Sequence, residues 1–226
     1  MRHKPSCMVH KIDGVGVDLS RFYPVSSVGE KISLRREKNY SEHDFMLIYT
    51  AEFIPRKNHR LLFDILPGLR ERIPGLKAVL CGKGELLGHY RSLAERQGMD
   101  YVLFTGYTKD VADWCRMADV LVMPSLQEGL PMAMIEAIAT GLPVVASDIR
   151  GHRDVIADCV NGFLFAPDDR AGFSRAIFAL YNNPALRADM GQRNVMLARR
   201  YGVGAALDGM AGVYGDLIAD GDCLYD

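Results

Sequence analysis

Short apolar runs alternate along the chain with longer segments whose apolar residues recur every three to four positions. The short runs are nearly unbroken, which is typical of strands in a parallel sheet covered on both faces. Six strands are predicted, at residues 45–49, 76–81, 101–105, 120–123, 143–146 and 162–165. Four helices are predicted between them, at residues 58–72, 85–97, 111–118 and 131–140. The pattern therefore predicts an α/β fold of three layers, a parallel sheet with helices on both faces.

Three regions follow from the same pattern. Residues 45–168 form the predicted α/β lobe. Residues 169–226 contain helical periods only, at 170–182, 184–200 and 203–219, and predict a helical tail that packs on the lobe. Residues 1–44 predict a leading segment with a structured turn at 14–18 and a polar, mobile loop at 26–41. With roughly 150 residues per domain, a chain of 226 residues is about one and a half domains.

Composition and charge exclude several classes of protein. The chain is 49% hydrophobic and 24% charged, which excludes disordered and fibrous proteins. A net charge of -1 offers no electrostatic footprint for nucleic acid. The chain has no apolar stretch long enough for a signal peptide or a transmembrane segment. Its cysteines are scattered singly and predict free thiols; they are Cys7, Cys81, Cys115, Cys159 and Cys223. We therefore expect a cytoplasmic protein, with peripheral association to a membrane left open.

The segment after the predicted strand at 120–123 carries the clearest candidate chemistry. Pro131 fits the first turn of a helix, so the positive end of the helix dipole would face a ligand such as a diphosphate. Gly129 allows close approach of the backbone, and Glu128 and Glu136 offer carboxylates that suit sugar and ribose hydroxyls. The alternative is that Glu128 is a solvated loop residue and that Glu136 pairs with a basic neighbour.

This segment resembles the signature of the retaining glycosyltransferases of family four, which is Pro-Ser, then Glu-Gly-x-Pro, then a second Glu after seven residues. Further motifs agree with that family in order and spacing; they are Gly16-Val17-Asp18, Lys57-Asn58, Gly82-Lys83-Gly84, Phe104-Thr105-Gly106-Tyr107, 141–147 and 161–164. The resemblance covers about residues 13–168. It implies one Rossmann-like lobe of the two-lobed GT-B architecture, the carboxyl-terminal lobe that binds a nucleotide sugar. The run at 148–154 resembles a subgroup from polysaccharide biosynthesis.

The resemblance implies a role for each matching residue. Glu128 would hold hydroxyls of the donor sugar and Lys57 would neutralise the diphosphate, which makes these two the catalytic candidates. Glu136 would hold the ribose, and Gly106 and Tyr107 would frame the base. The full set of donor-binding candidates is Arg56, Lys57, Gly82, Gly106, Tyr107, Glu128, Gly129, Leu130, Pro131 and Glu136. Taken alone, Lys57 is better explained as a solvated lysine at a helix start, and Tyr107 as a core or rim aromatic.

Two segments depart from this pattern or leave alternatives open. The family commonly has an arginine where this chain has Ala51-Glu52, and Arg56 is the candidate for the second positive charge. The run at 148–154 gathers Arg150, His152 and Arg153, which could touch an acceptor phosphate or a partner lobe. Its alternative is a turn fixed by Gly151, with ion pairs to Asp148 or Asp154. No metal site is expected, because His152 has no companions.

The resemblance implies transfer of a glycosyl group from a nucleoside diphosphate sugar, with retention of configuration and without a metal or other cofactor. A UDP-sugar is the favoured donor, and the setting is exopolysaccharide, capsule or lipopolysaccharide biosynthesis. Since the resemblance begins where the family's second lobe begins, we expect the acceptor lobe to be absent and the isolated chain to have little activity. An exposed inter-lobe face would invite a separate acceptor lobe or self-association. The alternatives are a non-catalytic partner subunit that binds nucleotide sugars and a lobe of a nucleotide-sugar epimerase.

Overall fold

A parallel sheet forms the centre of the computed structural model, which describes residues 10, 14 and 16–221. Its strands are β1 (Phe45–Thr50), β2 (Leu76–Cys81), β3 (Val102–Gly106), β4 (Val120–Met123), β5 (Val144–Ser147) and β6 (Gly162–Phe165). The strand order is β3-β2-β1-β4-β5-β6, with parallel pairing throughout. Every residue of β4 and β5 is buried, as expected for strands covered on both faces. The predicted parallel α/β fold is confirmed.

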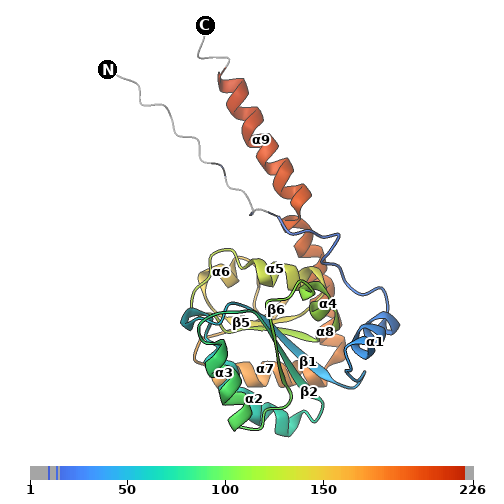
Figure 1. Ribbon diagram of the computed structural model, residues 1–226. Helices are drawn as coiled ribbons and strands as arrows, with labels where there is room; N and C mark the ends of the chain where they lie inside the picture. Colours follow the sequence, from blue (N-terminus) through green and yellow to red (C-terminus); the bar gives the residue numbers. More distant parts are fainter. Residues whose placement is uncertain (1–9, 11–13, 15, 222–226) are drawn as a thin grey trace.

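Helices cover both faces of the sheet (Figure 1). One face carries α2 (His59–Arg72), α3 (Leu87–Arg96) and α7 (Arg170–Asn182), and α2 packs against α7. The other carries α4 (Val111–Met117) and α5 (Met132–Ala139), with α8 (Pro184–Ala198) packed on α5. The short elements are η1 (Pro55–Lys57), α6 (Arg150–Arg153) and η2 (Arg199–Tyr201). The three predicted layers are therefore present.

The prediction of a mobile loop at 26–41 is wrong, because α1 (Val28–Glu37) lies there. The helix begins with reciprocal capping: the Ser27 hydroxyl accepts from Glu30 N (3.2 Å), and the Glu30 carboxylate accepts from Ser26 N (2.7 Å). Its anchor is Arg35, which is buried and donates to Asp119 Oδ2 (2.8 Å) and to a backbone carbonyl. A polar helix held by a buried ion pair has no apolar stripe, so the hydrophobic pattern did not reveal it.

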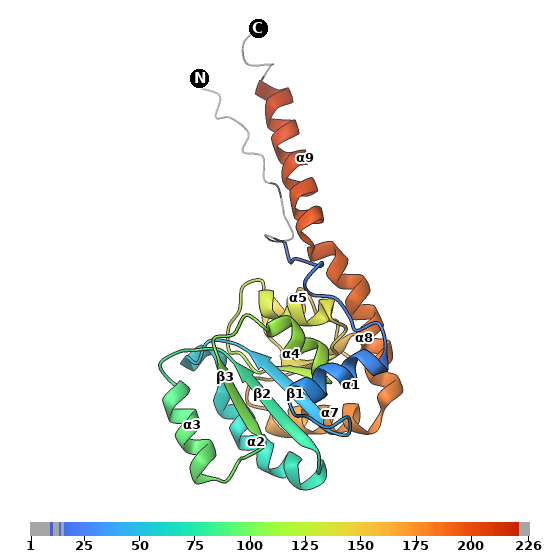
Figure 2. The ribbon, with the colours of Figure 1, turned by 45° about the vertical axis from the view of Figure 1, so that its right-hand side comes forward.

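The two longest helices of the tail differ in how they contact the lobe. Helix α8 is tied to the lobe by Asn194, which is fully buried and donates to Leu142 O (2.7 Å) and Asn161 O (2.9 Å). Helix α9 (Val203–Gly221) leads away from the lobe in both views (Figures 1 and 2). At its root, Val203 N donates to Val17 O (3.1 Å). The division of the chain into three regions stays a prediction.

Some predictions fall partly outside the described residues. Of the turn at 14–18, Val15 is not described, and Gly14 and Gly16 adopt positive φ. Cys7 and Cys223 also lie outside, whereas the described cysteines, Cys81, Cys115 and Cys159, are free thiols as expected. None of the described helices is long and apolar enough to cross a membrane.

Candidate functional site

The strand order reverses between β1 and β4, so the loops that follow these strands diverge there and leave room for a ligand. Lys57 reaches this point from η1, which follows β1, and Glu128 reaches it from the loop between β4 and α5. Lys57 Nζ donates to Glu128 Oε1 over 2.5 Å. Arg56 Nη1 lies 3.6 Å from Glu128 Oε2. The side chain of Glu128 is only 8% exposed, so two cations compensate a nearly buried carboxylate.

Backbone and hydroxyl contacts hold these two loops together. The hydroxyl of Tyr49, at the end of β1, donates to Lys57 O (2.7 Å) and lies 2.9 Å from Ser125 Oγ. Burial raises the pKa of Tyr49 far above its usual range, so this group stays a hydroxyl. Leu126 N donates to Arg56 O (2.8 Å). The loops that carry Lys57 and Glu128 are thus joined directly by hydrogen bonds.

Asn58 is the turning point between η1 and α2. Its backbone is left-handed (φ 51°), a conformation that asparagine tolerates better than most residues. Its amide donates to Pro124 O (3.0 Å) and Pro167 O (2.9 Å), so it links the loops after β1, β4 and β6. The predicted helix at 58–72 therefore begins at His59, after a 3-10 turn that presents Lys57.

Glu136 lies in the second turn of α5 and is half-buried. Burial raises the pKa of its carboxyl group, and the charge of Arg21 opposes that shift. Among the described residues, it has no hydrogen bond or ion pair. The expected alternative, a solvated Glu128 and a paired Glu136, is the reverse of this geometry. Glu136 is therefore an available carboxylate on the helix that follows the Glu128 loop.

The remaining donor-site candidates lie at the same edge of the sheet. Gly82 N donates to Gly106 O (2.9 Å), so the ends of β2 and β3 are in contact. Gly82 has a φ of +154°, and a Cβ there would lie 1.9 Å from Ala51 O, so no other residue fits. Tyr107 is 75% exposed with Lys83 Nζ 5.7 Å from its ring centre. Tyr107 is thus a surface residue, not a core aromatic.

The start of α5 faces this edge as the sequence suggests, with one difference. Pro131 is the N-cap, and the helix begins at Met132, one residue later than predicted. Gly129 and Leu130 are exposed in front of it. Glu52, which stands where the resembled family commonly has arginine, is exposed and offers no positive charge.

The segment at 148–154 forms the short helix α6 instead of a plain turn. Arg153 Nη2 donates to Asp148 Oδ2 (2.9 Å), which is the ion pair that the structural alternative anticipated. His152, by contrast, is fully buried, and its Nδ1 lies 2.8 Å from Ser147 O. Two flanking arginines suggest an exposed segment, so no pattern in the sequence reveals this burial.

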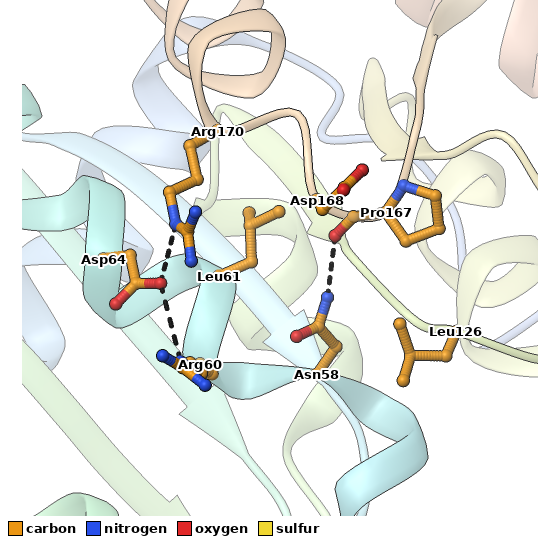
Figure 3. A pocket seen from close by; sticks show the side chains of 8 residues that line it. All are labelled: Asn58, Arg60, Leu61, Asp64, Leu126, Pro167, Asp168 and Arg170. Atoms are coloured by element: carbon orange, nitrogen blue, oxygen red, sulfur yellow. Dashed lines mark hydrogen bonds and ion pairs between the residues drawn. The ribbon is translucent and has the colours of Figure 1, made fainter.

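An open pocket lies beside the site, between α2 and the loops after β4 and β6 (Figure 3). Asp64 stands between Arg60 and Arg170, with Arg170 Nε 2.7 Å from Asp64 Oδ2. The residues that line the pocket are Asn58, Arg60, Leu61, Asp64, Leu126, Pro167, Asp168 and Arg170. Within the described part of the chain, no three His, Cys, Asp or Glu side chains gather as a metal site requires.

Comparison with known proteins gives consistent matches. A family model described as glycosyl transferases group 1 matches residues 30–195. The chain is 38% identical over 212 residues to putative glycosyltransferase EpsD of Bacillus subtilis, covering 93% of this chain and 55% of that protein. It is 33% identical over 217 residues to D-inositol 3-phosphate glycosyltransferase 2 of Catenulispora acidiphila, covering 91% and 50%. The chain thus spans about half the length of these curated relatives.

A third relative and two solved structures extend the comparison. The Escherichia coli UDP-Gal:alpha-D-GlcNAc-diphosphoundecaprenol alpha-1,3-galactosyltransferase is 26% identical over 211 residues, covering 91% of this chain and 54% of that protein. Anabaena Alr3699/HepE, in complex with UDP and glucose, has a TM-score of 0.78 at 21% identity, covering 88% and 55%. The C-terminal domain of LpcC, a glycosyl transferase group 1 family protein of Francisella tularensis, has a TM-score of 0.73 at 22% identity, covering 83% and 100%. At these identities the two structures confirm the fold.

Proposed function

We propose that the carboxyl edge of the sheet binds the nucleoside diphosphate sugar from which a hexosyl group is transferred, since the chain belongs to the glycosyl transferases group 1 family. The observation that carries this proposal is the Lys57–Glu128 pair at the reversal of strand order. Glu136, on the adjoining helix, has no hydrogen-bond or ion-pair partner among the residues that the structure describes. The anionic diphosphate of the ligand would meet the cations at this edge of the sheet, and its sugar and ribose hydroxyls would meet the carboxylates.

Each group has a role that follows from its charge. The diphosphate competes with Glu128 for the ammonium of Lys57, and Arg56 supplies a second cation beside it. Released in part from Lys57, the Glu128 carboxylate accepts hydrogen bonds from hydroxyls of the sugar. The amides of Gly129 and Leu130 and the positive end of α5 face the diphosphate. When the bond from the anomeric carbon to the diphosphate breaks, these groups stabilise the negative charge that the leaving group gains.

The nucleoside would lie along the ends of β2 and β3. Glu136 accepts hydrogen bonds from the ribose hydroxyls, and the backbone of Gly82 and Gly106 with the ring of Tyr107 frames the base. HepE, which shares the fold, is solved with UDP and glucose, and this favours a UDP-sugar here. The transfer retains the anomeric configuration and needs no metal, because the cations of the chain carry the charge of the diphosphate.

The wider setting belongs to the same proposal. One relative is named for transfer to a diphosphoundecaprenol-linked sugar. This supports a role in building exopolysaccharide, capsule or lipopolysaccharide, in the cytoplasm and at the membrane surface. Because the chain spans about half of its relatives' length, we propose that transfer also needs an acceptor-binding lobe and that these 226 residues alone turn over little donor.

Helix α9 carries a surface suited to such a lobe or to a second copy of the chain. Its exposed apolar side chains recur at three- and four-residue spacings; they are Val203, Leu207, Met210, Tyr214 and Ile218. Apolar stripes of this kind mark interaction surfaces. We propose this stripe as the inter-lobe face.

Calorimetric titration of the chain with uridine, guanosine and adenosine diphosphate sugars tests the donor site. We expect binding of UDP-sugars, and Glu136→Ala should weaken it about tenfold because a charge-assisted hydrogen bond to ribose is lost. Glu95→Ala, an exposed carboxylate on α3, is the matched control and should leave binding unchanged. If no nucleotide sugar binds, or if both variants bind like the unchanged chain, the donor-site assignment fails.

A further inference from the structure

His152 is a buried side chain that the proposed donor contacts leave without a role. It is fully buried in α6, directly after the carboxyl end of β5. A carbonyl oxygen can only accept, so the contact of 2.8 Å with Ser147 O places the proton of the neutral ring on Nδ1. Burial lowers the pKa of His152 below its usual value, which keeps the ring neutral. Its Nε2 is then a bare acceptor, buried and without a hydrogen-bond partner among the described residues.

The turn that carries His152 lies directly against the Glu128 loop. A Cβ on Gly151 would lie 2.1 Å from Gly129 O and 2.7 Å from Glu128 O, so only glycine allows this packing. The charges of Glu128 and Lys57 both act on the His152 ring, the first raising and the second lowering its pKa. The ring with the unpartnered nitrogen therefore belongs to a turn that packs against the loop of the carboxylate proposed to hold the sugar.

The chemistry of Nε2 selects its partner. A bare acceptor repels the oxygens of a diphosphate and attracts an O–H group. The Glu128–Gly129 peptide, which packs on this turn, has room to adjust, since Gly129 is exposed and nothing lies within 4 Å of the position of a Cβ on it. Among the described residues, His59 is the other buried histidine without a hydrogen-bond partner, and it differs: its ring stacks 4.1 Å from that of Phe53.

We propose that His152 is a specificity-determining residue of the donor site, whose Nε2 accepts a hydrogen bond from a hydroxyl of the hexosyl group once the sugar engages Glu128. This inference rests on the proposed function. It goes further by assigning a residue to the sugar alone, separate from the contacts to the diphosphate and the nucleoside.

His152→Asn isolates the contact, because the amide of asparagine can still donate to Ser147 O but has no counterpart of Nε2. Both forms are titrated with UDP and with UDP-glucose, UDP-galactose and UDP-N-acetylglucosamine. We expect the affinity for UDP to stay within twofold and the affinity for at least one UDP-sugar to fall five- to tenfold. Equal losses for UDP and UDP-sugar, or no loss at all, would overturn the inference. If the unchanged chain binds no UDP-sugar, the proposed function fails instead.

A second measurement needs no variant at this position. In long-range proton–nitrogen spectra of the unchanged chain, the Nε2 resonance of His152 should move on addition of a UDP-sugar and stay in place with UDP. A resonance that responds equally to both ligands would contradict the contact to the sugar.

The packing of the turn can be tested separately. Gly151→Ala should weaken binding of the UDP-sugar severalfold, because its methyl group displaces the Glu128–Gly129 peptide. Gly88→Ala is the matched control in α3, where nothing lies within 4 Å of the added Cβ, and should bind like the unchanged chain. Equal binding by the two variants would show that the turn does not position the loop.

Discussion

Glu128 is a nearly buried carboxylate whose charge is compensated by two neighbouring residues of one segment, Lys57 and Arg56. Removing one partner of a buried pair leaves the other charge uncompensated, which costs more than the pair itself contributes. The same cations that stabilise the folded chain would thus be shared with a bound diphosphate. We therefore predict that stability and ligand affinity are linked at this residue.

The link can be measured with Lys57→Met. We expect this variant to lose about 2 kcal/mol of unfolding free energy in urea, since Arg56 compensates only part of the charge of Glu128. Adding Glu128→Gln should restore much of that loss, because no buried carboxylate then remains unpaired. Arg60→Met, a change at a side chain that is 77% exposed, is the control. Additive losses in the double variant would contradict the coupling.

His59 gives the chain a pH-dependent stability. Burial lowers the pKa of His59 from its usual 6.5 to about 4. The unfolded chain binds a proton that the folded chain excludes, so stability is lost as pH falls from about 6.5 toward 4. We expect a loss of about 2.5 kcal/mol between pH 8 and pH 4.5 from this group. His59→Phe, which keeps the stacking with Phe53, should show a correspondingly smaller loss in urea titrations. Equal losses in both forms would refute the assignment.

At the scale of elements, α1 is held by charge instead of apolar surface. The Asp119 carboxylate accepts hydrogen bonds from Lys31 Nζ (2.7 Å), Arg35 Nη2 (2.8 Å) and the backbone N–H of Met46 (2.8 Å). These contacts hold the pKa of Asp119 below its usual value despite its burial. They join α1 to the beginning of β1 and β4, at the edge of the sheet opposite the candidate site. Helix α1 is therefore tied to the sheet by charged side chains.

Arg35→Met tests this anchor. We expect a loss of about 3 to 5 kcal/mol in unfolding free energy, because Asp119 keeps its burial but loses a buried partner. Arg36→Met, on the neighbouring and 72% exposed side chain, should change stability by less than about 0.5 kcal/mol. Urea denaturation of the two variants provides the comparison. A similar effect of both would show that α1 is not anchored by its buried arginine.

At the scale of the whole molecule, a closed α/β lobe carries one helix that extends away from it (Figure 2). The lobe buries its own core and includes α8 through Met190, Gly191 and Asn194. The side chains of α9 that the structure describes are exposed or half-buried. The stability of the lobe should therefore depend on α8 and hardly on α9.

Truncation after Gly202 should leave the melting temperature within a few degrees and donor binding unchanged, because little apolar surface is buried by α9. It should also lower self-association at high concentration in analytical ultracentrifugation, since the apolar stripe is removed. Truncation after Asn183, which removes α8, is expected to unfold the lobe. A lobe that unfolds without α9 would contradict this division.

The sequence by itself determined the sheet and pointed to the loops that carry the candidate site. Strands buried on both faces have nearly unbroken apolar sequences, and β2, β4 and β6 lie where these runs predict. The motif around Glu128 is local, because helix start, glycine and carboxylate are neighbours in the chain. Parallel strands bring such loops to one edge, so the sequence also predicts at which edge of the sheet the candidate residues lie.

The tertiary structure decided the partners. Lys57 and Glu128 are 71 positions apart, and only the pairing of β1 with β4 brings them into contact. Arg35 and Asp119 form a buried pair that anchors the polar helix α1. His152 is buried although the arginines near it in the sequence suggest an exposed segment. Periodicity reports which residues leave water, but the burial of a charged or polar group depends on a distant partner. That partner is set by the fold, so a pattern of hydrophobic and polar positions cannot contain it.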